Sequence, residues 1–212
     1  MMAKVTIVGA GNMGRAIGAR LAGQENRLQV LAPTAEHATS LADELGNGVT
    51  GGGIDDNVDG EVVVLATPYD GALDFVAKRG SDLTGKVVVD ITNPVDWASF
   101  DRLVTPSDSS AAQEIAAKLP QGVPVVKAFN TTFAGTLSSG EVAGQELDVL
   151  IAGDDQDAKE KVIRLVESAG LRAVDAGPLR RAQQLEHLGF LHMALQESLG
   201  SEYGSALKIV TP

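Results

Sequence analysis

Residues 4–14 read Lys4-Val-Thr-Ile-Val-Gly-Ala-Gly-Asn-Met-Gly14, an apolar strand that runs directly into the pattern G-x-G-x-x-G. In this pattern Gly9 permits a sharp turn off the strand, Gly11 permits close approach to a pyrophosphate, and Gly14 permits close packing of the next helix. That helix begins with free N–H groups and a partial positive charge that face the phosphates. An ordinary glycine turn is the alternative, but the strand–turn–helix setting favours a dinucleotide site.

Composition limits the classes of protein to which this chain can belong. Of its 212 residues 44% are hydrophobic and only 4% aromatic, which is typical of a packed α/β protein. A net charge of −11 and a pI near 4.6 argue against nucleic acid or an anionic membrane as a partner. The absence of cysteine excludes disulfides and thiolate chemistry. Because no charged-then-apolar leader and no membrane-length apolar run occurs, we expect a cytoplasmic protein.

Apolar runs and helical periodicities alternate along the chain. Strands are predicted at Val5–Gly9, Leu28–Ala32, Val62–Ala66, Val87–Ile91, Val123–Ala128, Leu147–Ala152 and Leu171–Asp175, with a short final strand at Ala206–Val210. Helices are predicted at Met13–Gln24, Ala35–Leu45, Tyr69–Arg79, Ser109–Leu119 and Asp155–Ser168, and a long one after Pro178. The run Gly51–Gly53 predicts a flexible loop.

This βαβα order predicts an α/β fold, a Rossmann-type doubly wound sheet that is mostly parallel. We expect a single domain, residues 1–212, with a core at 1–128. Residues 129–212 would form a helical and strand extension that completes the sheet and the cleft.

Three loops follow predicted strands and carry polar or turn-forming residues. They read Ala66-Thr-Pro-Tyr69, Thr92-Asn-Pro94 and Phe129-Asn-Thr-Thr132. Each alone is consistent with turn chemistry, because Pro and Asn favour turns. Together they indicate a ligand site, because ligands of such sheets bind at the carboxyl ends of the strands.

The end of the second strand bears on the choice between NAD and NADP. An NAD site usually has an acid there for the ribose 2′-OH. Here the strand is followed by Pro33-Thr34-Ala35, with no acid and no arginine. Thr34 and His37 are the nearest donors, so the sequence favours NADP over NAD.

Several segments together resemble the NADPH-dependent reductases of the deazaflavin coenzyme F420. They are Gly9-Ala-Gly-Asn-Met-Gly14, Val88-Val-Asp-Ile-Thr-Asn-Pro94, Lys127-Ala-Phe-Asn-Thr131 and Asp175-Ala-Gly-Pro-Leu179. The resemblance spans nearly the whole chain, and it implies hydride transfer between a nicotinamide and a deazaflavin or a similar planar acceptor. The family usually has a Ser-Arg-like pair where this chain has Pro33-Thr34.

The resemblance also implies which residues hold the cofactor. The expected cofactor-binding residues are Gly9, Ala10, Gly11, Asn12, Met13, Gly14, Pro33, Thr34, Thr67, Pro68, Asn93, Pro94 and Thr131. Residues 10–13 would contact the pyrophosphate, and residues 33–34 the adenosine side. Thr67, Pro68, Asn93 and Thr131 would lie along the nicotinamide half. The second ring would lie between the 127–132 loop and the start of the helix after Pro178.

Alternatives remain open. Lys127 is the candidate proton donor if the protein is instead a dehydrogenase or imine reductase of a small carbonyl-type substrate, although a strand-end lysine is commonly solvated. A non-catalytic NADP(H)-binding redox sensor is a third interpretation. His187 and His192, five residues apart, face different sides of a helix, and we expect no metal site. The long final helix is compatible with a homodimer.

Overall fold

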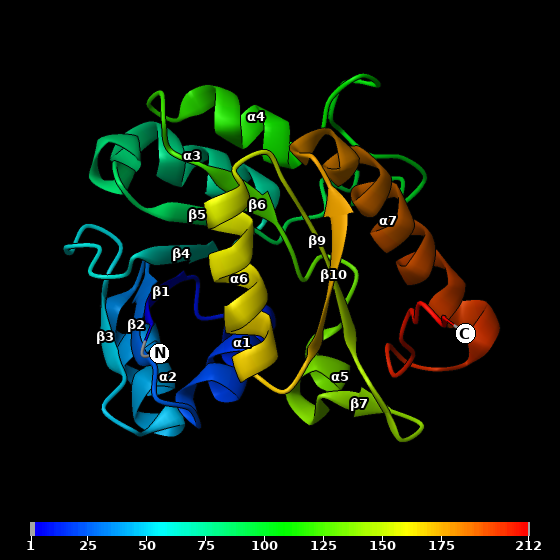
Figure 1. Cartoon of the computed structure of the whole chain (residues 1–212), viewed down its shortest axis with the longest axis horizontal. Helices are drawn as coiled ribbons and strands as arrows, with labels where there is room; N and C mark the ends of the chain where they lie inside the picture. Colours follow the sequence, from blue (N-terminus) through cyan, green and yellow to red (C-terminus); the bar gives the residue numbers. More distant parts are fainter. Residues whose placement is uncertain (1–2, 212) are drawn as a thin grey trace.

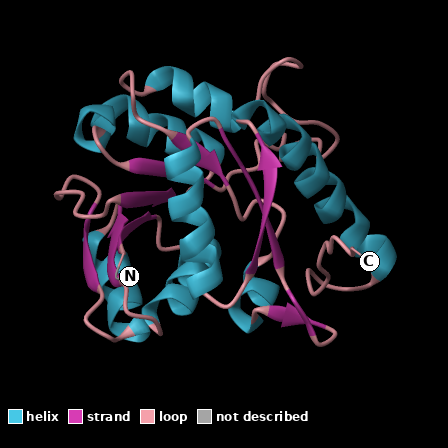
Figure 2. Cartoon of the chain, in the orientation of Figure 1, coloured by secondary structure: helices cyan, strands magenta, loops and turns pink. Residues whose placement is uncertain are grey.

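Eight strands form one sheet in the order β10-β9-β6-β5-β4-β1-β2-β3 in the computed structural model, which describes residues 3–211 (Figures 1 and 2). The strands are β1 (Lys4–Val8), β2 (Arg27–Ala32), β3 (Thr50–Gly53), β4 (Val62–Leu65), β5 (Val87–Asp90), β6 (Val125–Lys127), β9 (Asp148–Gly153) and β10 (Arg172–Gly177). All neighbouring pairs are parallel except β6 and β9. The predicted doubly wound, mostly parallel sheet is therefore confirmed.

Helices cover both faces of this sheet. They are α1 (Asn12–Ala22), α2 (Ala35–Leu45), α3 (Tyr69–Arg79), α4 (Ala111–Lys118), α5 (Ala134–Ser139), α6 (Gln156–Ser168) and α7 (Ala182–Leu199), with short 3₁₀ turns at Gly80–Leu83 and Leu179–Arg181. Alternate strand residues point to opposite faces. In β4, Val62 and Val64 pack in the core that includes α1 and α6, whereas Val63 and Leu65 pack in the core that includes α3 and α4. Because both faces are buried, the strand reads as a continuous apolar run.

The strand order reverses between β1 and β4. The chain builds β2 and β3 on one side of β1 and then returns to build β4, β5 and β6 on the other. The backbone N–H of Ala66 donates to the carbonyl of Val8 at 2.8 Å, so the turns that leave β1 and β4 lie side by side. A reversal of this kind leaves a crevice at the carboxyl ends of the strands, where ligands bind.

The second half of the chain extends the sheet. Strand β9 pairs antiparallel with β6, and β10 forms the edge beside it. A small hairpin of β7 (Glu141–Val142) and β8 (Gln145–Glu146) stands apart from the main sheet. Helix α7 runs along the extension toward the chain end (Figure 1). No helix within residues 3–211 is both long enough and apolar enough to cross a bilayer.

The predicted loop at Gly51–Gly53 is wrong, because these residues belong to edge strand β3 and pair with β2. A Cβ on Gly51 would lie 2.5 Å from backbone atoms of Ala38 and Thr39 in α2. The glycine therefore provides space for a helix that lies directly on the strand, rather than flexibility.

The predicted strand at Ala206–Val210 is also wrong, because this tail forms no ladder. The Asp148 carboxylate holds it instead, accepting from the backbone N–H of Ile209 at 2.8 Å and from Lys208 at 2.5 Å. The strand predicted at Val123–Ala128 is shorter than expected, since only Val125–Lys127 pairs regularly.

Candidate functional site

The turn between β1 and α1 has the geometry that its glycines predict. Gly9 has a φ of +119°, and a Cβ there would lie 2.8 Å from the carbonyl carbon of Ala66. A Cβ on Gly14 would collide with the carbonyl oxygen of Gly9. A Cβ on Gly11 would meet no protein atom within 4 Å. Gly9 and Gly14 therefore shape the turn, whereas Gly11 faces open space that a ligand can fill.

Helix α1 begins beside this open space without a capping side chain. Gly11 occupies the N-cap position, no side chain bonds to the first turn, and no acid lies within it. The first backbone N–H groups of a helix have no partner inside the helix, and the helix dipole places partial positive charge there. This is the standard arrangement for binding a pyrophosphate, and it fits a dinucleotide.

Two adjoining cavities, each of about 520 Å³, open at the carboxyl ends of the strands. The first is lined by Gly11, Asn12, Met13, Ala66, Thr67, Pro68, Tyr69, Ile91, Thr92, Asn93, Trp97 and Met193. The second shares six of these residues and continues along Phe129, Asn130, Thr132, Phe133, Ala134, Gly135, Glu202 and Tyr203. The two cavities therefore form one long cleft over the reversal of the strand order. A further cavity of about 560 Å³ lies at the opposite edge, near Lys4 and Arg27.

The cleft brings together six of the expected cofactor-binding residues and leaves the others outside it. Its lining includes Gly11, Asn12, Met13, Thr67, Pro68 and Asn93. Pro33 and Thr34 are exposed at the tip of β2, whereas Pro94 and Thr131 are buried and line neither cavity. Ala10 packs against the core between β2 and α2.

Two asparagines join the loops that follow β5 and β6. The Asn93 amide donates to the carbonyl of Asn130 at 2.7 Å, and the Asn130 amide donates to Asn93 Oδ1 at 2.9 Å. The Asn130 amide also donates to the carbonyl of Leu185 in α7 at 2.8 Å. Gly189 lets α7 lie this close, since a Cβ there would be 2.8 Å from the Asn130 carbonyl oxygen. One wall of the cleft is thus tied to α7.

Unsatisfied polar atoms concentrate at this cleft. Within the described part of the chain, four buried side-chain polar atoms have no hydrogen-bond partner, and three of them belong to residues that line the cleft: Thr67, Thr92 and Asn130. Phe129, which also lines it, has a left-handed φ of 62°. Unpaired buried groups and backbone outliers are costly and gather where function requires them.

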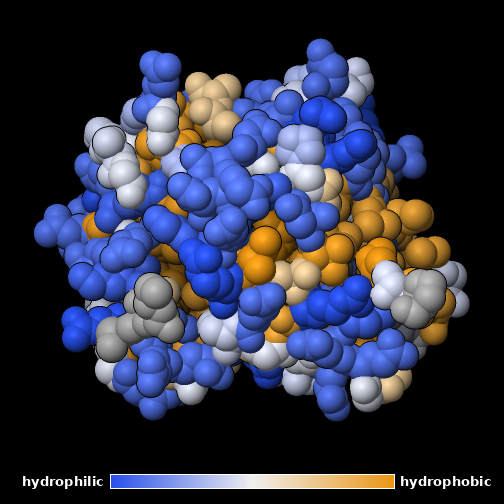
Figure 3. All heavy atoms as spheres, viewed as in Figure 1, coloured by the Kyte–Doolittle hydropathy of each residue, from blue (hydrophilic) through white to orange (hydrophobic). Residues whose placement is uncertain are grey.

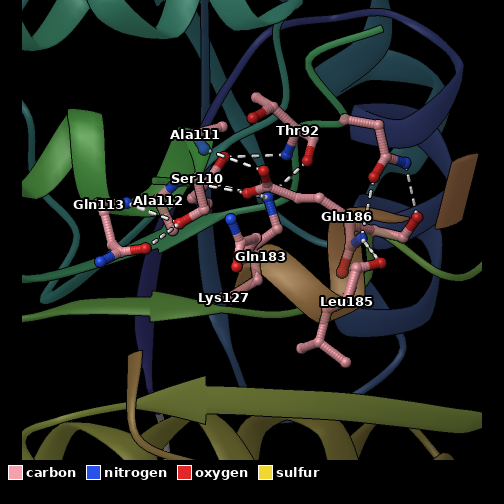
Figure 4. A network of polar contacts seen from close by, with 12 residues as sticks. Thr92, Ser110, Ala111, Ala112, Gln113, Lys127, Gln183, Leu185 and Glu186 are labelled. Atoms are coloured by element: carbon pink, nitrogen blue, oxygen red, sulfur yellow. Dashed lines mark hydrogen bonds and ion pairs between the residues drawn. The ribbon is translucent and has the colours of Figure 1, made fainter. Parts of the chain in front are cut away.

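Behind the cleft lies a buried ion cluster (Figure 4). The Lys127 ammonium donates to Asp90 Oδ2 at 2.8 Å, to Glu186 Oε1 at 2.8 Å and to the carbonyl of Thr92 at 2.5 Å. The three charged side chains have no exposed surface. The strand-end lysine is therefore buried, not solvated, and each of its three ammonium hydrogens has an acceptor.

Glu186 links this cluster to α4. Its carboxylate accepts from the backbone N–H of Ala111 at 3.0 Å and of Ala112 at 3.4 Å, at the beginning of that helix. Burial raises the pKa of Glu186, while the charge of Lys127 opposes that shift. Burial, with the neighbouring carboxylates of Glu114 and Glu186, also raises the pKa of Tyr69 to about 12.

Sequence reasoning missed several residues of the cleft, among them Trp97, Phe133, Met193 and Tyr203. Trp97 is 67% exposed and lines both cavities, as does Met193 from the middle of α7. Phe133 and Tyr203 line the second cavity. We expected the start of the last helix to form a wall of the cleft, but Met193 in the middle of α7 lines the cavities instead. The one available signal was the single tryptophan close behind Asn93-Pro94, in a chain with few aromatics.

Comparisons with known proteins indicate a family. A family model described as "NADP oxidoreductase coenzyme F420-dependent" matches residues 4–94. The F420-dependent NADP reductase of Methanothermobacter thermautotrophicus is 30% identical over 206 residues, which cover 89% of this chain and 87% of that protein. The F420-dependent NADP reductase of Methanocaldococcus jannaschii is 28% identical over 97% of both chains.

A solved structure agrees with these sequence relatives. It is that of a candidate F420-dependent NADP reductase from Arthrobacter sp. FB24, which superposes with a TM-score of 0.87 at 26% identity and covers 99% of this chain and 100% of that one. The shared sequence, the shared fold and the phosphate-binding turn lead to one assignment: the chain belongs to the family of F420-dependent NADP reductases.

Proposed function

We propose that this chain is an oxidoreductase that exchanges hydride between NADP(H) and the deazaflavin coenzyme F420 or a similar planar acceptor. The observation that carries the proposal is the pair of adjoining cavities at the phosphate-binding end of α1, which provide places for two ring systems in contact. Relatives named as F420-dependent NADP reductases over nearly the whole chain support it. When both are bound, the nicotinamide exchanges hydride at its C4 with C5 of the deazaflavin.

In this proposal the protein binds the two cofactors and orients their rings. The backbone N–H groups at Gly11, Asn12 and Met13 hold the pyrophosphate. Thr67, Pro68 and Asn93 lie along the nicotinamide half in the first cavity. The second cavity, between the Phe129–Phe133 segment and Met193, receives the acceptor ring. Holding the two rings in a reactive arrangement supplies much of the rate.

We give Lys127 a positioning role. A proton donor must present a hydrogen toward the substrate, and the three ammonium hydrogens of Lys127 are directed to Asp90, Thr92 and Glu186. This arrangement favours hydride exchange between two cofactors over reduction of a carbonyl or imine, in which the lysine would donate the proton.

The decisive experiment mixes the protein with NADPH and oxidised deazaflavin and follows the visible absorption of the deazaflavin. We expect the absorption to fall at a rate proportional to enzyme concentration. Absence of bleaching while NADPH binds would overturn the proposal in favour of the redox sensor. Turnover of imines or small carbonyl compounds without turnover of deazaflavin would favour the dehydrogenase.

We propose NADP as the preferred nucleotide, with Thr34 near its ribose phosphate. Thr34 is the exposed N-cap residue of α2, and its side chain makes no capping bond, so the hydroxyl and the helix N-terminus are free for a ligand. Thr34→Asp should shift preference toward NADH, because a carboxylate accepts from a 2′-OH and repels a 2′-phosphate. Thr34→Ser is the matched control and should retain the preference.

We also propose that two copies associate through α7 and that the protein works in the cytoplasm, where NADP(H) is available. Leu191, Leu195 and Leu199 stand four residues apart on α7 and are 55%, 40% and 58% exposed. Figure 3 shows the apolar surface that gathers along this helix. A self-complementary apolar helix face suits a two-fold dimer. Sedimentation should find a dimer that Leu195→Glu converts to a monomer, and a monomeric wild type would overturn this proposal.

A further inference from the structure

Trp97 lies on a loop that the structure holds firmly at the mouth of the cleft. Val95 and Leu103 form an isolated bridge across its base. The backbone N–H of Val104 donates to the Pro94 carbonyl at 2.7 Å. Inside the loop the Arg102 guanidinium donates to the Asp96 carboxylate at 3.0 Å. The indole is nevertheless 67% exposed, so the loop presents a large apolar side chain to solvent.

Two further aromatic rings support the indole from behind. The Trp97 and Phe100 ring centroids are 5.8 Å apart, and Phe100 meets Phe190 of α7 edge-on at 5.5 Å. Phe100 adopts a left-handed φ of 51°, which is uncommon for a bulky residue. The loop thus accepts an unfavourable backbone conformation at the residue that supports the indole.

The second cavity is also lined by the aromatic residues Phe133 and Tyr203. Tyr203 meets Phe133 edge-on at 5.1 Å, and Phe133 lies against the imidazole of His192 at 4.3 Å. Six residues line both cavities, namely Asn12, Met13, Ile91, Asn93, Trp97 and Met193. Trp97 is the one aromatic residue among them. It therefore stands where two ring systems would meet, and the second cavity has further aromatic residues in its lining.

We propose that Trp97 is the residue that selects a planar acceptor, by stacking its indole on the conjugated ring in the second cavity. The inference rests on the proposed function, because it assigns the acceptor of that same cleft. A flat, polarisable ring gains from contact with an indole face, whereas a small aliphatic carbonyl compound does not. Such contact also covers the indole and removes water from beside the reacting atoms.

The test compares Trp97→Leu with Trp97→Phe, and uses Val104→Ala as a control. Val104 is 52% exposed on the same loop and lines neither cavity. For Trp97→Leu we expect the KM for oxidised deazaflavin to rise by roughly tenfold, the upper range of one lost aromatic stack. The KM for NADPH should change less than twofold. Trp97→Phe should recover most of the loss, and Val104→Ala should match the wild type.

A spectroscopic signature separates stacking from a general loss of structure. Oxidised deazaflavin added to wild-type protein saturated with NADP⁺ should show a shifted and weakened visible band, and the change should be smaller with Trp97→Leu. If deazaflavin is reduced but Trp97→Leu retains the wild-type KM and band shift, the inference is overturned while the proposed function stands. If calorimetry finds no deazaflavin binding to the wild type, both are overturned. Circular dichroism of each variant verifies that it folds.

Discussion

Replacing Lys127 by methionine should destabilise the fold by about 3–5 kcal/mol, the usual cost of removing one partner of a buried ion pair. Its ammonium is 2.8 Å from carboxylate oxygens of both Asp90 and Glu186, and none of the three side chains is exposed. Methionine fills a similar volume, so the cost is electrostatic and not that of a cavity. We expect the lower end of the range, because each carboxylate keeps a backbone donor: Thr92 N–H for Asp90 and Ala111 N–H for Glu186.

The stability lost in Lys127→Met should depend on pH, and the electrostatics of Glu186 determine the direction of that dependence. Burial already raises the pKa of Glu186, and Lys127 opposes that rise, so removing Lys127 raises the pKa further. A carboxyl whose pKa is higher in the folded than in the unfolded protein contributes stability that is present below its unfolded value and is lost as pH rises toward the folded value. The deficit of Lys127→Met should therefore be larger at pH 8 than at pH 5.

Urea denaturation followed by circular dichroism at both pH values measures these free energies of unfolding. Lys159→Met is the matched control, since Lys159 pairs at 2.9 Å with Asp175, whose side chain is 40% exposed; that pair should contribute at most about 1 kcal/mol. Adding Glu186→Gln to Lys127→Met should recover part of the loss. A deficit below about 1 kcal/mol at pH 8, or one equal at both pH values, would refute the electrostatic reasoning. If the Lys127→Met variant had wild-type stability but no turnover, Lys127 would again be the candidate proton donor.

Four further outcomes test other parts of the structure. Gly11→Ala should leave the free energy of unfolding within about 0.5 kcal/mol of wild type, yet calorimetry should find NADPH binding weakened by roughly tenfold or more. Gly14→Ala, whose Cβ collides with the Gly9 carbonyl, should instead destabilise the fold by about 3 kcal/mol. Gly51→Ala should cost about 2 kcal/mol through its collision with α2, but Gly53→Ala, whose nearest neighbour would be 3.9 Å away, should cost far less in the same denaturation assay. Burial lowers the pKa of His192, so its contribution to stability should be fully present above the unfolded value of about 6.5 and should be lost as pH falls from there through the lower folded value; Gln in its place should remove this slope from the thermal midpoint. Because β9 pairs with β6, we propose that residues 129–212 fold with the core, and calorimetry should find one unfolding transition, not two.

Most of the fold could be predicted because its signals are local. The strands of a doubly wound sheet are buried on both faces, so β4 and β5 read as runs of valine. The helix at Tyr69–Arg79 has its predicted ends, because Pro68 precedes it and Gly80 follows it. The glycines of β3 were misinterpreted, since sequence alone does not distinguish a glycine that is flexible from one against which a helix packs. The tail was misinterpreted because its contacts run through one distant carboxylate, Asp148.

The cleft could be predicted only where it follows the strand ends. Thr67 and Asn93 lie just beyond β4 and β5, so their convergence follows from topology. Trp97 and Tyr203 reach the cleft from a loop and from the tail, and no periodic pattern places either one. The partners of Lys127 are 37 and 59 residues away along the chain, so no short-range pattern indicates them.

The position of the ion cluster explains why a protein would bury three charges behind its cleft. Asp90 is the last residue of β5, and the cleft residue Asn93 follows it by three positions. In the same way Lys127 is the last residue of β6, and the cleft residue Asn130 follows it by three positions. Glu186 adjoins Leu185, whose carbonyl accepts from Asn130, and it also holds the first turn of α4. One ammonium group thus cross-links β5, β6 and α7 immediately beneath the two loops that form the cleft wall. Apolar side chains of equal volume would fill the same space, often with equal or greater stability, but without directional contacts. We infer that the cluster is retained because it fixes where Asn93 and Asn130 stand, and hydride exchange between two stacked rings is sensitive to that placement.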